Sequence, residues 1–310
     1  MVKIDLITGF LGAGKTTFLI KYANYLLERG ERICILENDY GAINVDMMLL
    51  QEFNNICDME MVAGGCDFDC HKRRFKTKLI AMGMKGYDRV IIEPSGIFDT
   101  DEFFDTLYED PLDSWYDIGS VISVIDPGIT NKLSKESEYV LVNQLAASGR
   151  IIISKVDNYN NTEIDNVINY IDSLMNKYDM KLDKDIILRK NEKDFNDEDY
   201  KKIMNSSYRS QPHVKMNVME VNKYSSLYFM NINISLEELK AKANILFNNP
   251  EYGSIMRIKG FIKDNNGWLE FNMTKELLNV NTLNNGQDVI IIIGENLNES
   301  KINEFIGKGE

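Results

Sequence analysis

The sequence has few of the residues that hold disulfide-rich or membrane proteins together. Its 310 residues include only four cysteines, five prolines, two tryptophans and two histidines. A secreted disulfide scaffold would be shorter and much richer in cysteine. No apolar run approaches the ~20 residues that cross a bilayer. The first eight residues also lack a basic segment followed by a long apolar one. We therefore expect a cytoplasmic protein with reduced thiols that binds no membrane.

Basic residues are also in deficit. Lysine and arginine number 35 against 48 aspartates and glutamates, which gives a net charge of −13. A protein that grips nucleic-acid phosphates needs a basic surface, so no nucleic-acid partner is expected. The hydrophobic content of 44% is enough to bury real cores. The length suits two domains of ordinary size.

Apolar strands alternate with helical segments in the first part of the chain. The expected strands are 3–8, 33–37, 56–62, 89–93, 121–125 and 151–153, and the expected helices are 16–28, 71–84, 100–109 and 134–147. Such alternation predicts an α/β fold with a mostly parallel sheet that is covered on both faces. Asn-rich stretches at 158–161 and 281–285 predict turns.

The pattern changes after about residue 180. The remaining strands are expected near 227–234, 255–263, 268–273 and 289–293, with helices near 236–247 and 299–306. This mixture predicts a smaller C-terminal α+β domain. We place the domains at 1–205 and 211–310, joined by a polar connector.

A glycine-rich loop follows the first predicted strand. Its spacing fits G-x-x-x-x-G-K-[ST] over Gly9, Phe10, Leu11, Gly12, Ala13, Gly14, Lys15, Thr16 and Thr17. Glycines let the backbone approach an anion closely, and the N–H groups of the next helix point at the phosphates. Lys15 would reach the β- and γ-phosphates, and the Thr16 hydroxyl would bind Mg²⁺. The order of strand, loop and helix favours a P-loop nucleoside triphosphatase over a turn that binds nothing.

Two acidic residues are expected near this loop. Glu93 ends an apolar strand within Glu93-Pro94-Ser95-Gly96 and would hold Mg²⁺ through a water, while the Gly96 N–H would meet the γ-phosphate. Such a loop can change shape when that phosphate leaves. Asp39 follows the second strand and is a candidate to position Mg²⁺ or the attacking water. Taken alone, Glu93 would be an ordinary residue in a turn. The predicted catalytic residues are therefore Lys15, Asp39 and Glu93.

A third segment indicates which base is bound. Ser154, Lys155 and Asp157 follow the strand at 151–153 in an S-K-x-D pattern. A carboxylate accepts hydrogen bonds from N1–H and the 2-amino group of guanine, whereas adenine has no donors there. The lysine stem can lie along the base plane. The segment predicts GTP, and the alternative is a charged loop without a ligand.

The segment around Cys66 is the most unusual of the sequence. Cys66 and Cys70 would share one face of a helix that begins near Asp67, and His71 is next to them. Thiolates and imidazole suit Zn²⁺ or a similar ion, and Asp67 or Asp69 would complete the ligand set. The alternative is two small buried thiols and a surface histidine.

Together these segments resemble the CobW-like family of P-loop GTPases, which includes metallochaperone-type proteins. The resemblance rests on residues 8–17, Asn38-Asp39-Tyr40-Gly41, Gly64-Gly65-Cys66, Glu93-Pro94-Ser95-Gly96, Ser154-Lys155-Val156-Asp157 and Arg257-Ile258-Lys259-Gly260. It implies a P-loop GTPase domain, a CobW C-terminal-like domain, a nucleotide-dependent homodimer, and a zinc or cobalt ion bound between two switch segments.

The sequence also departs from the family pattern. The family usually carries C-x-C-C after the glycine, but here Phe68 and Asp69 occupy the last two of those places and Cys70 comes one residue later. A metal site would thus be rearranged to Cys66, Cys70 and either His71 or Asp69. The His-rich tracts of some members are absent, since the only histidines are His71 and His213.

These patterns predict slow GTP hydrolysis with Mg²⁺, coupled through a conformational switch to the binding of zinc or cobalt and its delivery to a client metalloprotein. Because the predicted metal segment lies between the two phosphate-sensing segments, metal and nucleotide would affect each other's binding. Two alternatives remain open. One is a P-loop kinase acting on a small metabolite, and the other is a GTP-gated adaptor that transfers no metal.

Overall fold

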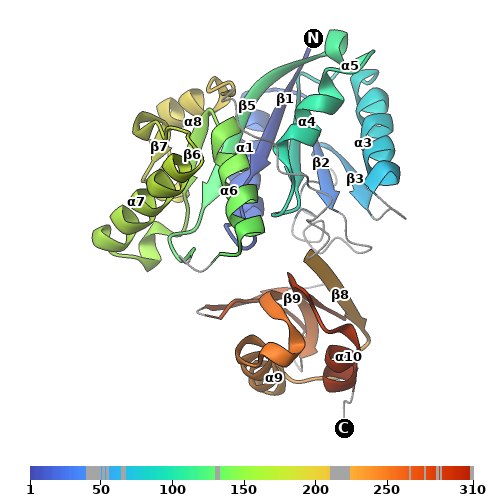
Figure 1. Cartoon of the computed structure of the whole chain (residues 1–310). Helices are drawn as coiled ribbons and strands as arrows, with labels where there is room; N and C mark the ends of the chain where they lie inside the picture. The colour runs from blue at the N-terminus through green and yellow to red at the C-terminus, as the bar shows by residue number, and fades with distance from the viewer. Residues whose placement is uncertain are drawn as a thin grey trace. The chain divides into compact units, whose positions relative to one another are not determined.

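The computed structural model describes residues 1–39, 50, 53, 56–63, 68–129, 133–209, 224–264, 267–275, 277–283, 286 and 288–307. The chain divides into two compact units, Met1–Val214 and Lys215–Glu310, which are treated separately (Figure 1). In the part that is described, no helix has the length and apolar character needed to cross a membrane.

The first unit is built on a parallel sheet of seven strands. The strands are β1 (Val2–Thr8), β2 (Ile33–Asp39), β3 (Asp58–Ala63), β4 (Arg89–Pro94), β5 (Tyr116–Ile125), β6 (Arg150–Ile153) and β7 (Ile187–Leu188). Their order across the sheet is β3-β2-β4-β1-β5-β6-β7, and every pairing is parallel. All the carboxyl ends therefore meet at one edge, where ligands of open α/β sheets bind.

Helices cover both faces of this sheet, because its strands are apolar on both sides. On one face, α1 (Lys15–Glu28) and α8 (Asp197–Met204) pack over Ile7, Ile35 and Ile91. The opposite face carries α3 (Phe68–Gly83), α4 (Thr100–Leu107), α5 (Leu112–Trp115), α6 (Lys135–Ala147) and α7 (Asn161–Lys177). This layered arrangement is visible in Figure 1 and confirms the predicted P-loop α/β class.

The second unit is an antiparallel sheet with helices. Its strands are β8 (Tyr224–Met230), β9 (Ser254–Asp264), β10 (Gly267–Met273), β11 (Leu278–Leu283) and β12 (Val289–Glu295), in the order β11-β10-β9-β12-β8. Helices α9 (Leu236–Asn248) and α10 (Glu299–Gly307) share one hydrophobic core with the sheet. The prediction of a smaller α+β domain is confirmed.

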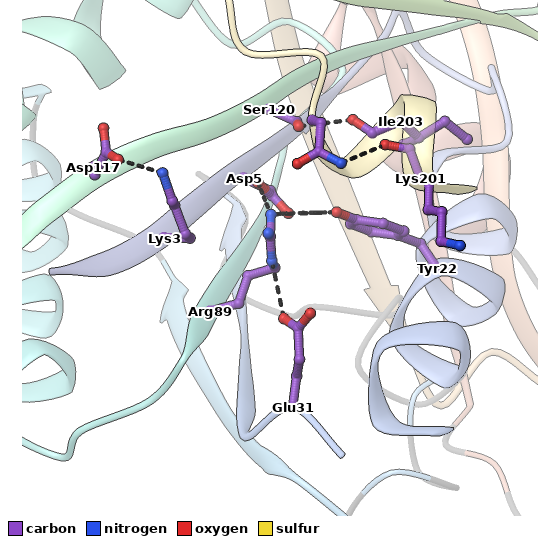
Figure 2. Close-up of polar contacts among 10 residues, drawn as sticks. Lys3, Asp5, Tyr22, Glu31, Arg89, Asp117, Ser120, Lys201 and Ile203 are labelled. Atoms are coloured by element: carbon purple, nitrogen blue, oxygen red, sulfur yellow. Dashed lines mark hydrogen bonds and ion pairs between the residues drawn. The ribbon is translucent and has the colours of Figure 1, made fainter. Parts of the chain in front are cut away.

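A buried ion pair ties β1 to β4 within the first unit (Figure 2). One guanidinium nitrogen of Arg89, Nη1, donates to both carboxylate oxygens of Asp5 at 2.7 Å, and the Tyr22 hydroxyl donates to Oδ2 of Asp5 at 2.8 Å. Arg89 also reaches Glu31 through Nε at 3.2 Å. The pairing of β1 with β5 skips Gly119 at this point, and a β-carbon there would lie 2.3 Å from Oδ1 of Asp5. A glycine bulge thus makes room for the pair.

Candidate nucleotide and metal site

The glycine-rich loop joins β1 to α1 through backbone conformations that favour glycine. Gly9 has φ 148°, Gly12 has φ 78° and Gly14 has φ 93°. A β-carbon on Gly9 would lie 2.3 Å from the carbonyl oxygen of Val124. Gly14 is the N-cap of α1, and the first turn of that helix contains no acidic residue. The positive end of the helix is therefore left for an anion.

The three residues predicted to contact phosphate and magnesium open α1. Lys15 is buried, Thr16 is half-buried and Thr17 is exposed. The Thr16 hydroxyl donates a 2.9 Å hydrogen bond to Oε1 of Glu93, a β4 residue that is only 4% exposed. Hydroxyl and carboxylate oxygens are the ligand type that Mg²⁺ prefers. The fold thus brings together the two residues that we predicted to hold the ion.

The segment after Glu93 lies directly against the glycine-rich loop. Gly96 is buried, and a β-carbon on it would lie 2.7 Å from the backbone nitrogen of Leu11. The Ser95 N–H donates to the carbonyl oxygen of Asn38 at 2.9 Å. On the other side, Nε2 of the fully buried Gln144 donates to the carbonyl of Gly96 at 3.2 Å. Ser95 and Gly96 are thus held between the glycine-rich loop, β2 and α6.

Ser154 and Lys155, the predicted base-side residues, donate hydrogen bonds to carbonyl oxygens of the glycine-rich loop. The Ser154 hydroxyl donates to the carbonyl oxygen of Ala13 at 2.6 Å. The ammonium of Lys155 donates to the carbonyl oxygen of Gly12 at 2.8 Å and forms an ion pair with Asp126. Lys155 itself has φ 52°, a left-handed conformation that aims its side chain back across the loop. This geometry connects the expected base pocket to the phosphate pocket.

Asp157 lies in a short 3₁₀ helix, Val156–Asn158, just beyond Lys155. Its carboxylate is exposed and forms an ion pair with Lys193. Hydrogen bonds from Lys193, and then from Asn191, lower its pKa below the ordinary range. The carboxylate is thus ionised at neutral pH, as an acceptor for guanine donors must be. An exposed ion pair of this type is worth little, so it can open at small cost.

Sequence reasoning missed three residues of this region. Asp126 pairs with Lys155 and accepts a 2.9 Å hydrogen bond from the Tyr159 hydroxyl. A signal was present, because Asp126-Pro127-Gly128 is a turn sequence directly after β5, at the edge where ligands bind. Asn38 belongs to one of the motifs that carry the family resemblance, but no role was predicted for it. Gln144 had no signal, since its contacts depend on packing between distant segments.

The thiol-bearing segment is only partly described. Cys66 lies outside the described residues, as does the side chain of Asp39, which ends β2. Cys70 is half-buried in the first turn of α3. His71 is fully buried, and its Nε2 lies 2.8 Å from Oδ1 of Asn38. The alternative of a surface histidine is therefore wrong. Within the described ranges, no three His, Cys, Asp or Glu side chains gather as a metal-binding group.

The motifs of this site match one family over most of the first unit. The nucleotide-binding domain model of CobW/HypB/UreG matches residues 3–182. The chain belongs to the CobW/HypB/UreG family. Membership confirms the resemblance that was inferred from the motifs.

Several known proteins are similar to this chain in sequence or in structure. The zinc chaperone YeiR of Escherichia coli is 28% identical over 158 residues, which cover 51% of this chain and 47% of YeiR. The zinc chaperone YjiA of the same organism is 26% identical over 163 residues, which cover 50% of each. The chain thus spans about half the length of these curated relatives. The crystal structure of Zn(II)-bound YjiA GTPase covers 99% of this chain and 98% of YjiA, with 17% identity and a TM-score of 0.38.

Proposed function

We propose that this member of the CobW/HypB/UreG family is a GTPase that couples its nucleotide state to the binding and delivery of a transition metal. The observation that carries the proposal is the arrangement around one glycine-rich loop. Thr16 and Glu93 meet at its phosphate end, and Lys155 reaches back to it from the segment that carries Asp157. Residues 1–205 would carry this chemistry, and 211–310 would form the second domain.

The proposed reaction is hydrolysis of the β–γ bond of GTP. Water attacks the γ-phosphorus, the bond to the bridging oxygen breaks, and GDP and phosphate leave. Lys15 neutralises charge that develops on the bridging oxygen, and the N–H groups at the start of α1 bind the phosphate oxygens. Thr16 and Glu93 would hold Mg²⁺, which would supply positive charge to neutralise the phosphates. Asp39 or Glu93 orients the attacking water.

Guanine selection is assigned to Asp157, with Lys155 along the base and Ser154 holding the loop. The Asp157→Asn variant tests this assignment by hydrogen-bond complementarity. Xanthine carries a second carbonyl where guanine has its amino group, and the amide of asparagine can donate to that carbonyl. The variant should therefore lose affinity for GTP and gain affinity for xanthosine triphosphate. An unchanged preference for GTP over both XTP and ATP would contradict the role of Asp157.

The metal part of the proposal rests on the family and on the thiols. Relatives carry the name zinc chaperone, and Cys70 stands in the first turn of α3, four residues after Cys66. Soft thiolate ligands suit Zn²⁺ or Co²⁺. We propose that these two thiols take the metal, that His71 or an aspartate assists them, and that a homodimer formed with GTP presents the metal to a client metalloprotein.

The proposal is tested by elemental analysis of the purified protein with its GTPase rate measured alongside. Stoichiometric zinc or cobalt that is lost in Cys66→Ser and Cys70→Ser variants, together with GTP hydrolysis, supports it. GTP hydrolysis with no thiol-dependent metal would indicate a GTP-gated adaptor. A preference for ATP with transfer of phosphate to a metabolite would indicate a kinase.

A further inference from the structure

We propose that Asn38 and His71 are positioning residues that link the loop after Glu93 to the thiol-bearing start of α3. This inference rests on the proposed function, because it names the residues through which nucleotide state would reach the metal thiols. Neither residue was expected to play this part, and Asn38 is not among the predicted nucleotide or metal contacts.

Asn38 makes two hydrogen bonds that point to different parts of the site. Its backbone carbonyl accepts from the Ser95 N–H at 2.9 Å. Its side-chain Oδ1 lies 2.8 Å from Nε2 of His71. Asn38 and His71 are both fully buried, so water does not compete for these bonds. One residue at the end of β2 therefore contacts the phosphate-sensing loop with its main chain and α3 with its side chain.

His71 transmits a displacement to Cys70 because the two are neighbours in the first helical turn of α3. A helix moves as a rigid element over such a short distance, so a shift of the imidazole carries the adjacent thiol with it. The bond with Asn38 occupies Nε2 of the imidazole. In this proposal His71 therefore positions Cys70 through Nε2 instead of offering that atom to the metal.

Two buried polar atoms in residues that contact this loop are available to hydrogen-bond a second arrangement of it. Among the described residues, Nδ2 of Asn38 has no hydrogen-bond partner, and neither has Oε1 of Gln144. Gln144 holds the same loop from its other side through the carbonyls of Gly96 and Phe98. A buried polar group without a hydrogen-bond partner destabilises the arrangement that leaves it so. A loop movement that brings a carbonyl to Asn38 and an N–H to Gln144 would satisfy both atoms, and coupling requires such a second arrangement.

Metal affinity in two nucleotide states is the first test. The Asn38→Leu variant keeps a side chain of similar size and the backbone bond to Ser95, but it loses the bond to His71. Co²⁺ is titrated by its thiolate absorption in the presence of GDP or a non-hydrolysable GTP analogue. We expect at least about a fivefold difference in wild-type affinity between the two states. In Asn38→Leu the ratio should fall to about one, with the GDP-state affinity within twofold of wild type. The exposed Asn248→Leu variant is the matched control.

The outcomes separate this inference from the proposed function. A wild-type protein without thiol-dependent Co²⁺ binding, or with equal affinity in both states, would refute the coupling function itself. A coupled wild type with an equally coupled Asn38→Leu variant would refute only the role of Asn38.

Alkylation of Cys70 without metal is the second test, and it uses His71 variants in case Asn38→Leu does not fold. Iodoacetamide labelling is followed at the Cys70 peptide with each nucleotide, and buried Cys34 is the internal control. We expect the labelling rate to depend on the nucleotide in wild type and to lose that dependence in His71→Leu. His71→Gln keeps a hydrogen-bond donor for Asn38, so the labelling rate of this variant should again depend on the nucleotide. Equal dependence in His71→Leu would overturn the link. In the Co²⁺ titration, equal loss of affinity in both nucleotide states for both His71 variants would also overturn the link, because Nε2 of His71 would then bind the metal instead of Asn38.

Discussion

The substitution Gly96→Ala should weaken the binding of GTP far more than the binding of GDP. The added β-carbon would lie 2.7 Å from the backbone nitrogen of Leu11 and 2.9 Å from its Cα. Both are main-chain atoms of the glycine-rich loop, so neither can turn aside as a flexible side chain would. Ordinary van der Waals contact begins near 3.4 Å, whereas the β-carbon would lie 2.7 Å from the Leu11 nitrogen. The segment that carries residue 96 must therefore move away from the loop by about 0.7 Å. The Gly96 N–H would then no longer meet the γ-phosphate.

Loss of one hydrogen bond to a charged group is worth about 1.5–3 kcal/mol. Affinity for a GTP analogue should therefore fall by roughly 10- to 100-fold. GDP has no γ-phosphate, so its affinity should stay within about twofold. A displacement approaching 1 Å at the reacting group can also cost about 100-fold in rate. We expect single-turnover hydrolysis to fall by that order.

Fluorescent-nucleotide titration and single-turnover hydrolysis measure these effects, and thermal melts check that the variant is folded. Gly307→Ala is the control, because a β-carbon at Gly307 meets nothing within 4 Å. If Gly96→Ala bound and hydrolysed GTP as wild type does, the assignment of Gly96 to the γ-phosphate would be refuted. Equal loss of GTP and GDP affinity would also contradict it.

Three further predictions concern stability, the base-side contact and the thiols. Asp5→Asn removes the negative charge that compensates buried Arg89. The free energy of unfolding, measured by urea denaturation, should fall by about 3 kcal/mol. A loss below about 1 kcal/mol would contradict a stabilising role for this ion pair. Lys155→Met loses the hydrogen bond to the Gly12 carbonyl. The affinities for GTP and GDP should both fall by about tenfold in equilibrium titrations. Unchanged affinities would contradict a role for this contact. Burial raises the pKa of the Cys34 thiol to about 12 and that of Cys57 to about 11. Both should resist iodoacetamide at pH 8 and react as the pH approaches those values, whereas fast labelling of Cys34 at pH 8 would show that its burial is not maintained.

The phosphate end of the site was predictable because its chemistry is local. Gly9, Gly14 and Lys15 lie in one continuous segment whose spacing follows from the size of a phosphate group. Glu93 was identified by its place at the end of an apolar strand, and β4 does bring it to Thr16. In a parallel sheet the carboxyl ends of strands gather at one edge, so position along the chain was enough.

The remaining contacts depend on side chains that meet only after folding. Gln144 is in the middle of a helix, and nothing in its neighbourhood indicates that it will reach the carbonyl of Gly96. His71 was expected to bind metal or face solvent, but its burial against Asn38 arises because α3 packs beside the end of β2. Such pairings are not contained in the spacing of either segment alone.

Two errors in the secondary structure have a local explanation. The turn predicted for 158–161 is wrong at Asn161, which is the first residue of α7; Asn160 is the N-cap of that helix and forms a capping box with Glu163. That signal was present in the sequence. The turn predicted for 281–285 is wrong for its first three residues, which belong to β11. This edge strand is largely exposed, so it lacks the apolar alternation by which strands are recognised.

Calorimetric titration of zinc into the metal-free protein measures whether the bound nucleotide changes the affinity for metal. It should be done once with GDP and Mg²⁺ and once with a non-hydrolysable GTP analogue and Mg²⁺. Coupling of nucleotide and metal predicts thiol-dependent zinc binding whose affinity differs by at least about fivefold between the two states. By reciprocity, zinc should change the affinity for the GTP analogue, relative to GDP, by the same factor. Identical zinc affinity in both states would contradict the account.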